Sequence, residues 1–154
     1  KNLCDIDPEN AASYQENASA YIAQLEMLDQ NFRDFFAGVS NKTMVFGDRF
    51  PFRYFAEEYG LDCFAAFPGC SSETEPSVAT IAFLTDKVKS ENITTVFYIE
   101  FSNHQVADSI AEAAGAKTAL FHSCHNVSEQ EQRDGATYLS LMEQNLNTLK
   151  EALH

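Results

Sequence analysis

The sequence predicts an α/β fold in which a four-stranded parallel sheet carries helices on both faces and one long helix precedes the sheet. The expected strands lie near residues 43–47, 63–67, 94–100 and 117–122. Stretches with helical periodicity separate them, and strands that alternate with helices of this length are joined by right-handed crossovers into a parallel sheet. Runs such as Val96–Ile99 are apolar without alternation, as in strands buried on both faces. The 154 residues suffice for one domain with its own core.

The long helix is expected to begin at Asp7 and to end at Gly38. Asp7 is a favourable N-cap, Pro8 suits the first helical position, and Gly38 suits a helix end. Its apolar stripe has 4-3 spacing and comprises Tyr14, Ala18, Tyr21, Leu25, Leu28, Phe32 and Phe35. At 1.5 Å per residue the helix spans about 45 Å, which is long for such a small domain. Part of the stripe should therefore contact another lobe or another subunit, and self-association is one expected result.

The remaining helices follow the strands in sequence. They are expected at residues 52–59, 76–90, 104–114 and 137–153. Gly60 can end the helix at residues 52–59. The helix at residues 104–114 can be capped by Asn103 and ended by Gly115.

The charge of the chain narrows the classes of partner. The formal net charge is −13, from 23 acidic and 10 basic residues. A polyanion of this kind repels nucleic acids and anionic lipids, so neither is expected as a partner, although the charge also serves solubility. No stretch reaches the roughly 20 apolar residues of a membrane helix, and the first residues do not read as a signal peptide. A mature secreted protein would share both features, so the compartment stays open on this evidence.

The clearest candidate for chemistry is the sequence His122-Ser123-Cys124-His125, which follows the last expected strand. Imidazole and thiolate are good zinc ligands, and a loop after a strand can direct two of them at one ion. In the alternative interpretation, His122 faces the core and His125 caps the following turn. Ligands bind at the carboxyl ends of the strands in open parallel sheets, so the same edge is the place to look for further ligands.

Three more residues are expected at this edge. Cys70 is a small buried residue, a disulfide partner for Cys124, or a zinc ligand. Asp48 is a natural N-cap for the next helix, and it becomes a ligand if its carboxylate points into the cleft. Glu100 ends an apolar strand, so its carboxylate must be hydrogen-bonded, paired or bound to metal.

Several segments, taken in order, resemble the zinc- and manganese-binding solute receptors of bacterial ABC transporters. The segments are Asp7–Asn17 (DPENAASYQEN), Tyr54–Leu61 (YFAEEYGL), Glu73–Ser77 (ETEPS), Thr95–Glu100 (TVFYIE) and Tyr138–Leu146 (YLSLMEQNL). In that family two α/β lobes are joined by a long rigid helix, and the metal lies between the lobes. The resemblance implies that residues 1–40 are the inter-lobe helix, that 41–154 are the carboxyl-terminal lobe, and that the amino-terminal lobe is absent.

The resemblance also implies a function and a ligand set. Where the family has a first His ligand, this chain has Arg49 with Asp48 beside it, which is a departure from the pattern. Cys70 falls in the second ligand position, and His125 falls in the third, where manganese-type members have Asp. The implied protein binds zinc, with manganese as an alternative, and delivers it to an ABC permease from an extracytoplasmic location, as a cell-surface lipoprotein or in the periplasm. The resemblance therefore implies a binding protein without catalytic activity.

Two other classes of function compete with the receptor. A flavodoxin-like enzyme domain would use Cys124 with His122 or His125, and it would need a reactive thiol of low pKa. The sequence contains no GxSxG, P-loop, GxGxxG or HExxH motif that would support a known catalytic site. A structural or adhesion domain of the same fold is the third interpretation.

Overall fold

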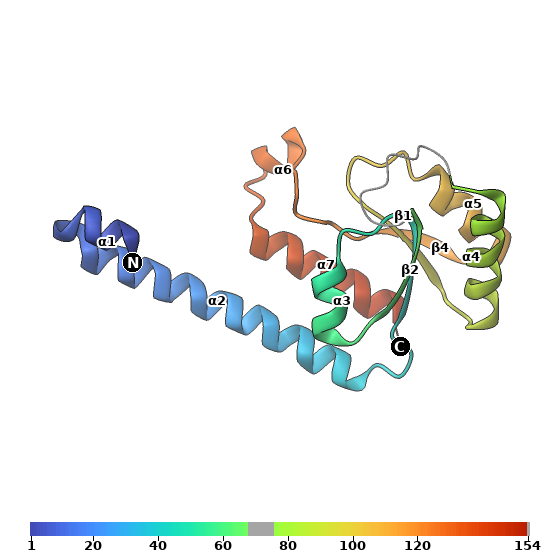
Figure 1. Cartoon of the computed structure of the whole chain (residues 1–154), viewed down its shortest axis with the longest axis horizontal. Coiled ribbons are helices and arrows are strands. Elements are labelled where there is room, and N and C mark those ends of the chain that lie inside the picture. Colours follow the sequence, from blue (N-terminus) through green and yellow to red (C-terminus); the bar gives the residue numbers. More distant parts are fainter. Residues whose placement is uncertain (68–75, 154) are drawn as a thin grey trace.

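The computed structural model describes residues 1–67 and 76–153, and it has an α/β lobe from which one long helix protrudes (Figure 1). The described strands are β1 (Thr43–Arg49), β2 (Asp62–Phe67), β3 (Thr95–Tyr98) and β4 (Lys117–Leu120). The described helices are α1 (Asn2–Ile6), the 3₁₀-helix η1 (Pro8–Asn10), α2 (Ala11–Gly38), α3 (Arg53–Tyr59), α4 (Val78–Ser90), α5 (Gln105–Ala114), α6 (Glu129–Arg133) and α7 (Tyr138–Ala152). None of these helices is long and apolar enough to cross a membrane.

The four described strands form one sheet in the order β2-β1-β3-β4, and every pair is parallel. Val45 of β1 is in register with Phe64 of β2 on one side and with Val96 of β3 on the other. The predicted four-stranded parallel sheet is therefore confirmed. All carboxyl ends of its strands point to the same edge, where the candidate ligands were expected.

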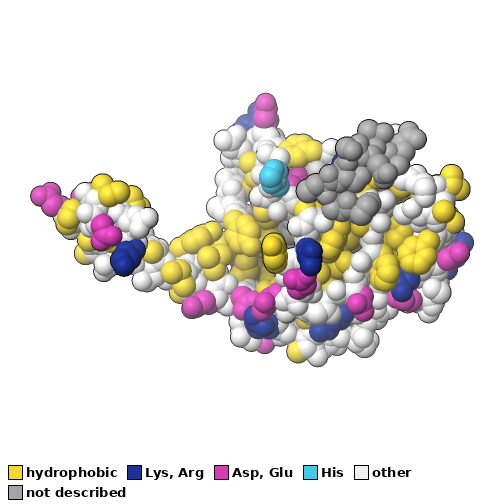
Figure 2. Space-filling model, viewed as in Figure 1, with side chains coloured by type: hydrophobic (Ala, Val, Ile, Leu, Met, Phe, Trp, Pro, Cys, Tyr) yellow, Lys and Arg dark blue, Asp and Glu magenta, His cyan; other side chains and the backbone are white. Residues whose placement is uncertain are grey.

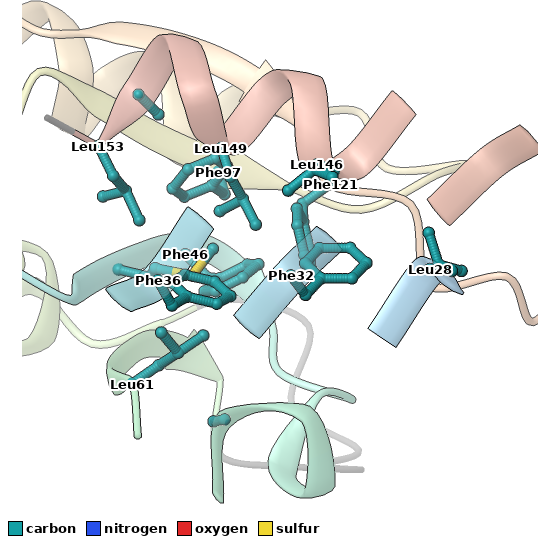
Figure 3. Packing of buried hydrophobic residues seen from close by; sticks show 13 residues of the cluster. Leu28, Phe32, Phe36, Phe46, Leu61, Phe97, Phe121, Leu146, Leu149 and Leu153 are labelled. Atoms are coloured by element: carbon teal, nitrogen blue, oxygen red, sulfur yellow. The ribbon is translucent and has the colours of Figure 1, made fainter. Parts of the chain in front are cut away.

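Helices cover both faces of this sheet, as predicted. Alternate residues of β1 point to opposite faces: Phe46 packs with α2 and α7, whereas Val45 packs with α4 and α5. The core on the first face contains a cluster of aromatic and leucine side chains from the sheet and the two helices (Figure 3). Burial on both faces explains why the central strands are apolar without alternation.

The long helix differs from the expectation at its beginning and agrees at its end. It begins at Ala11, after the separate short helices α1 and η1, and it ends at Gly38. Asp7 makes no backbone cap for α2; its carboxylate accepts hydrogen bonds from Asn10 Nδ2 at 2.9 Å and from the Tyr14 hydroxyl at 2.7 Å. Asp7 is the N-cap position of η1, with Pro8 following it, but its side chain caps no backbone N–H; the prediction that it starts the long helix was wrong.

Only the carboxyl-terminal part of α2 is anchored to the lobe. Phe32 is 1% exposed and packs edge-on against Phe55 of α3. Arg33 forms ion pairs with Asp29 at 2.8 Å and with Glu58 of α3. The aromatic contact and the Arg33–Glu58 ion pair connect α2 to α3, whereas the pair with Asp29 lies within α2 and orients Arg33.

The amino-terminal part of α2 carries apolar side chains that the lobe does not cover (Figure 2). Tyr21, Ile22 and Met27 are 44%, 52% and 64% exposed. Of these three, Tyr21 belongs to the predicted stripe, so part of that stripe is uncovered, as predicted; Ile22 and Met27 lie outside the predicted stripe. In Figure 1 this part of α2 extends away from the sheet, with α1 at its far end.

We expect Gly47→Ala to destabilise the fold, because helix α5 lies directly against this residue of β1. A Cβ atom at Gly47 would lie 2.2 Å from the Ala107 Cα, a backbone atom that cannot rotate away. The free energy of unfolding in urea should fall by about 3 kcal/mol. The matched control is Gly38→Ala, where an added Cβ meets nothing within 4 Å, and its stability should equal or slightly exceed that of wild type. Equal stability of the two variants would contradict the close approach of α5.

Candidate metal centre

The predicted site residues lie at the carboxyl edge of the sheet, in three places that the structure describes. Asp48 is in β1, Glu100 follows β3, and the loop of residues 122–125 follows β4. Cys70 lies outside the described residues. The prediction that polar and sulfur-bearing residues gather at one edge therefore holds for the described ones.

Asp48 does not cap a helix, contrary to the expectation. Strand β1 continues through Arg49, and α3 begins only at Arg53 without a side-chain cap. The Asp48 carboxylate is 5% exposed and accepts the backbone N–H of Ile99 at 3.2 Å and that of Arg49 at 2.7 Å. It thus ties the end of β1 to the segment that follows β3. The neighbouring Arg49, where the resemblance placed a His ligand, has its guanidinium 5.4 Å from the centre of the Phe67 ring.

Asp48 also borders a cavity of about 570 Å³ at the same edge. Glu100 and the residues that begin α5 line the cavity with it. Among the described residues, the lining of this cavity does not include the loop of residues 122–125. Glu100, which lines this cavity with Asp48, also hydrogen-bonds Ser123 of that loop.

His122 is buried, and its backbone and ring are both engaged in holding the loop. Its N–H donates to Asn145 Oδ1 at 2.7 Å, and its carbonyl accepts from Asn145 Nδ2 at 2.8 Å. The Nδ1 atom accepts the N–H of Cys124 at 2.9 Å, which places the proton of the neutral ring on Nε2. Within the described part of the chain, Nε2 has no hydrogen-bond partner, although Glu131 Oε1 lies 3.4 Å away. The interpretation in which His122 faces the core is confirmed. In this tautomer Nδ1 is engaged and Nε2 carries the proton, so coordination of an ion through Nε2 would require the other tautomer and loss of the hydrogen bond from Cys124.

Glu100 is hydrogen-bonded, as a carboxylate at the end of a buried strand must be. Its Oε2 accepts the N–H of Ser123 at 2.8 Å, and its Oε1 accepts the Ser123 hydroxyl. Burial is the largest single influence on the pKa of Glu100 and raises it, but the hydrogen bonds from Ser123 and from the backbone N–H of Glu100, together with the nearby His122, lower it below its usual range. Glu100 is therefore an anion at neutral pH.

Cys124 and His125 follow in the same loop with different exposures. Cys124 is half-buried with φ +60°, and its Sγ lies 3.8 Å from the His122 carbonyl oxygen. Burial, followed by the charges of Glu100 and Glu131, raises the pKa of the Cys124 thiol to about 11. His125 is exposed, and its N–H donates to Ser123 Oγ at 3.2 Å. His125 is thus the open imidazole of this loop, whereas Cys124 is a protonated thiol at neutral pH.

The thiol chemistry does not match the enzyme interpretation, which needed a cysteine of low pKa. Cys124 has a raised pKa, and its thiol is free. The disulfide alternative involves Cys70, which lies outside the described residues. Cys63 of β2 packs against the core, and burial raises the pKa of its thiol to about 12. Across residues 1–67 and 76–153, no three His, Cys, Asp or Glu side chains are arranged to hold a metal ion. The set His125, Cys124, His122, Cys70 and Asp48 therefore remains a prediction.

Three residues that the sequence analysis did not single out organise this loop. They are Asn145, Ser123 and Glu131. Asn145 is 2% exposed, and its position on the apolar side of the last helix was a signal that a polar group is buried there. Glu131 forms a capping box with Ser128 at the start of α6, and the spacing Ser-x-x-Glu could have indicated that helix.

The structure is thus a parallel α/β domain with a protruding helix and with ligand-type side chains at the carboxyl edge of its sheet, where open parallel sheets bind ligands. Residues 1–152 match the protein family described as zinc-uptake complex component A, periplasmic, and the chain belongs to this family.

Individual relatives agree with this assignment. The high-affinity zinc uptake system protein ZnuA of Bacillus subtilis is 35% identical over 147 residues, which are 96% of this chain and 46% of that protein. The crystal structure of the metal-dependent lipoprotein YcdH from Bacillus subtilis superposes with a TM-score of 0.84 at 34% identity, over 99% of this chain and 56% of that one. The Zn(II)-bound ZnuA-like domain of Streptococcus pneumoniae AdcA gives 0.79 at 31% identity, over 98% and 56%. The chain thus spans about half the length of these relatives.

We expect the buried thiols to react slowly with iodoacetamide. In metal-free protein at pH 7.5, Cys124 and Cys63 should be alkylated at least roughly tenfold more slowly than in the same chain unfolded in urea, because a raised pKa leaves little thiolate. Peptide mapping by mass spectrometry separates the cysteines. Fast alkylation of Cys124 in the folded protein would contradict its assignment as an inert thiol and would favour the enzyme interpretation.

Proposed function

We propose that this chain is the carboxyl-terminal lobe of an extracytoplasmic metal receptor, with zinc as the carried solute. Family membership over residues 1–152 supports the receptor class, and the names of the relatives describe zinc uptake and zinc binding. The observation that carries the proposal is the position of His125: an exposed imidazole on a tightly held loop at the carboxyl edge of the sheet. Imidazole and sulfur donors favour zinc over manganese, which is the alternative ion.

The proposed division of the chain is a helix that joins two lobes, residues 1–40, and a lobe, residues 41–154. The relatives are about twice as long as this chain, and α2 presents uncovered apolar side chains on the part that leaves the lobe. An amino-terminal lobe would cover this surface and supply the remaining ligands. Closure of two lobes around the ion would create the shape that an ABC permease recognises.

Within this lobe, His125 is the first proposed ligand. Its companions come from Cys70, Cys124, Asp48 and His122, of which His122 can offer only Nε2. A closed zinc site has four donors, so a lobe that supplies fewer of them binds weakly on its own. The raised pKa of Cys124 adds to this weakness, because the thiol must lose its proton to coordinate the ion.

The first test is a zinc titration of wild type against His125→Ala at pH 7.5, with a chromophoric chelator as competitor. His125→Ala should weaken binding by roughly tenfold or more, because it removes a directly coordinating imidazole. The matched control is His104→Ala, an exposed histidine at the start of α5 that hydrogen-bonds Asp108 instead. Wild-type binding should also fall as the pH drops below about 6, where imidazole takes up a proton.

Equal zinc affinity of wild type and His125→Ala would remove His125 from the site. Absence of zinc uptake by wild type would show that this lobe alone is only a scaffold. Loss of affinity in His104→Ala would place the site nearer α5.

We also propose that the uncovered part of α2 lets the isolated chain self-associate. Sedimentation velocity of wild type should show a species that grows with concentration, since burial of Tyr21 and Ile22 in a second copy removes apolar surface from water. The double variant Tyr21→Ser with Ile22→Ser should reduce this species. Gln24→Ser, an exposed polar position on the same helix, is the control for helix propensity. A wild type that stays monomeric at every concentration would contradict the proposal.

A further inference from the structure

The carboxylate of Glu100 joins the loops that follow β3 and β4. It accepts two hydrogen bonds from Ser123, one from the backbone N–H at 2.8 Å and one from the hydroxyl. The Ser123 Oγ in turn accepts the N–H of His125 at 3.2 Å. Glu100 therefore reaches the backbone of His125 through a single side chain.

Each backbone N–H from Ser123 to His125 has its own acceptor. Ser123 donates to Glu100, Cys124 donates to the Nδ1 of His122, and His125 donates to Ser123 Oγ. These three donors have three separate acceptors, one in the segment after β3 and two within the loop itself, which allows few alternative conformations of the loop. These hydrogen bonds therefore preorganise the conformation of the loop in the absence of an ion.

The backbone around Glu100 and Ser123 is held in sparsely populated conformations. Cys124 has φ +60°, and Phe101, directly after Glu100, has φ +59°. A non-glycine residue in this region is unfavourable by itself, and it persists where the surrounding contacts determine it. The hydrogen bonds between Glu100 and Ser123 lie directly beside both residues, so they are the contacts that hold these conformations.

We infer that Glu100 is a positioning residue for the metal-binding loop: it fixes the conformation of residues 123–125 and thereby the place of His125. The inference rests on the proposed function only for the role of His125; the clamp between the two loops stands on the geometry. Hydrogen bonds to an ionised carboxylate are roughly twice as strong as neutral ones, and Glu100 is an anion at neutral pH. Groups hydrogen-bonded directly to a ligating side chain typically change metal affinity by about 10- to 100-fold when they are removed, and Glu100 acts less directly, through Ser123 on the backbone of His125.

The first experiment needs no metal. Glu100→Gln should speed amide hydrogen exchange of Ser123, Cys124 and His125 by roughly tenfold, because the amide offers one acceptor oxygen where the carboxylate offers two, and one Ser123 donor loses its partner. Exchange in the sheet, for example at Val96 and Phe97, should stay as in wild type. Glu112→Gln is the control, because it removes the same charge at an exposed position near the end of α5.

The second experiment is a zinc titration of the same variants together with Ser123→Ala and Ser123→Thr. Glu100→Gln and Ser123→Ala should bind zinc roughly tenfold or more weakly than wild type. Ser123→Thr keeps the hydroxyl and should restore most of the affinity, which a loss of global stability would not explain. Glu112→Gln should bind as wild type does.

The two experiments separate the inference from the proposed function. Unchanged exchange at residues 123–125 in Glu100→Gln would overturn the clamp. Faster exchange with unchanged zinc affinity would overturn the role of Glu100 in positioning a ligand. If wild type takes up no zinc, the proposed function fails for this lobe, and hydrogen exchange still decides whether Glu100 holds the loop.

Discussion

Asn145 is a buried amide in α7, and its two hydrogen bonds to the backbone of His122 fix the end of β4. Beyond the last ladder bond a strand has backbone groups without partners, and leaving them unpaired in the interior is unfavourable. Asn145 satisfies both groups of His122 at once, since an amide side chain offers a donor and an acceptor side by side. The same helix packs against α2, so the position of the histidine loop relative to the long helix depends on this one side chain.

Two carboxylates repeat this arrangement along the edge of the sheet. Asp48 accepts the N–H of Ile99 and so connects β1 to the segment after β3, and Glu100 accepts the N–H of Ser123 and so connects β3 to the loop after β4. Both acids therefore accept backbone N–H groups of the segments that follow the strands at the carboxyl edge. In this structure both carboxylates hold the segments that follow the strands, whereas the imidazole of His125 is exposed at the same edge.

Much of the fold was predictable from the sequence, because periodicity reports burial directly. The strands and the larger helices fall close to their expected positions, and Gly38, Gly60 and Gly115 end helices as expected. Residues with more than one favourable environment were not predictable. Asp48 suits a helix N-cap in sequence, yet its carboxylate accepts a bond from Ile99, 51 positions away in the chain. The location of the site at the carboxyl edge of the sheet was predictable. The hydrogen-bond partners of His122 and Glu100 were not, because they depend on which loops the topology brings together.

Helix α2 also acts as a lever. Its 28 residues span about 42 Å. The helix packs against α3 and α7 from Leu25 onward. The part of α2 before Leu25 is about 20 Å long. If α2 tilted by about 10° where it contacts α3 and α7, its amino-terminal end would move by about 3.5 Å. Small adjustments among Phe32, Phe55 and the Arg33 ion pairs are thus magnified at the far end. The stiffness of these aromatic and ionic contacts therefore determines how far the amino-terminal end of α2 can move relative to His125.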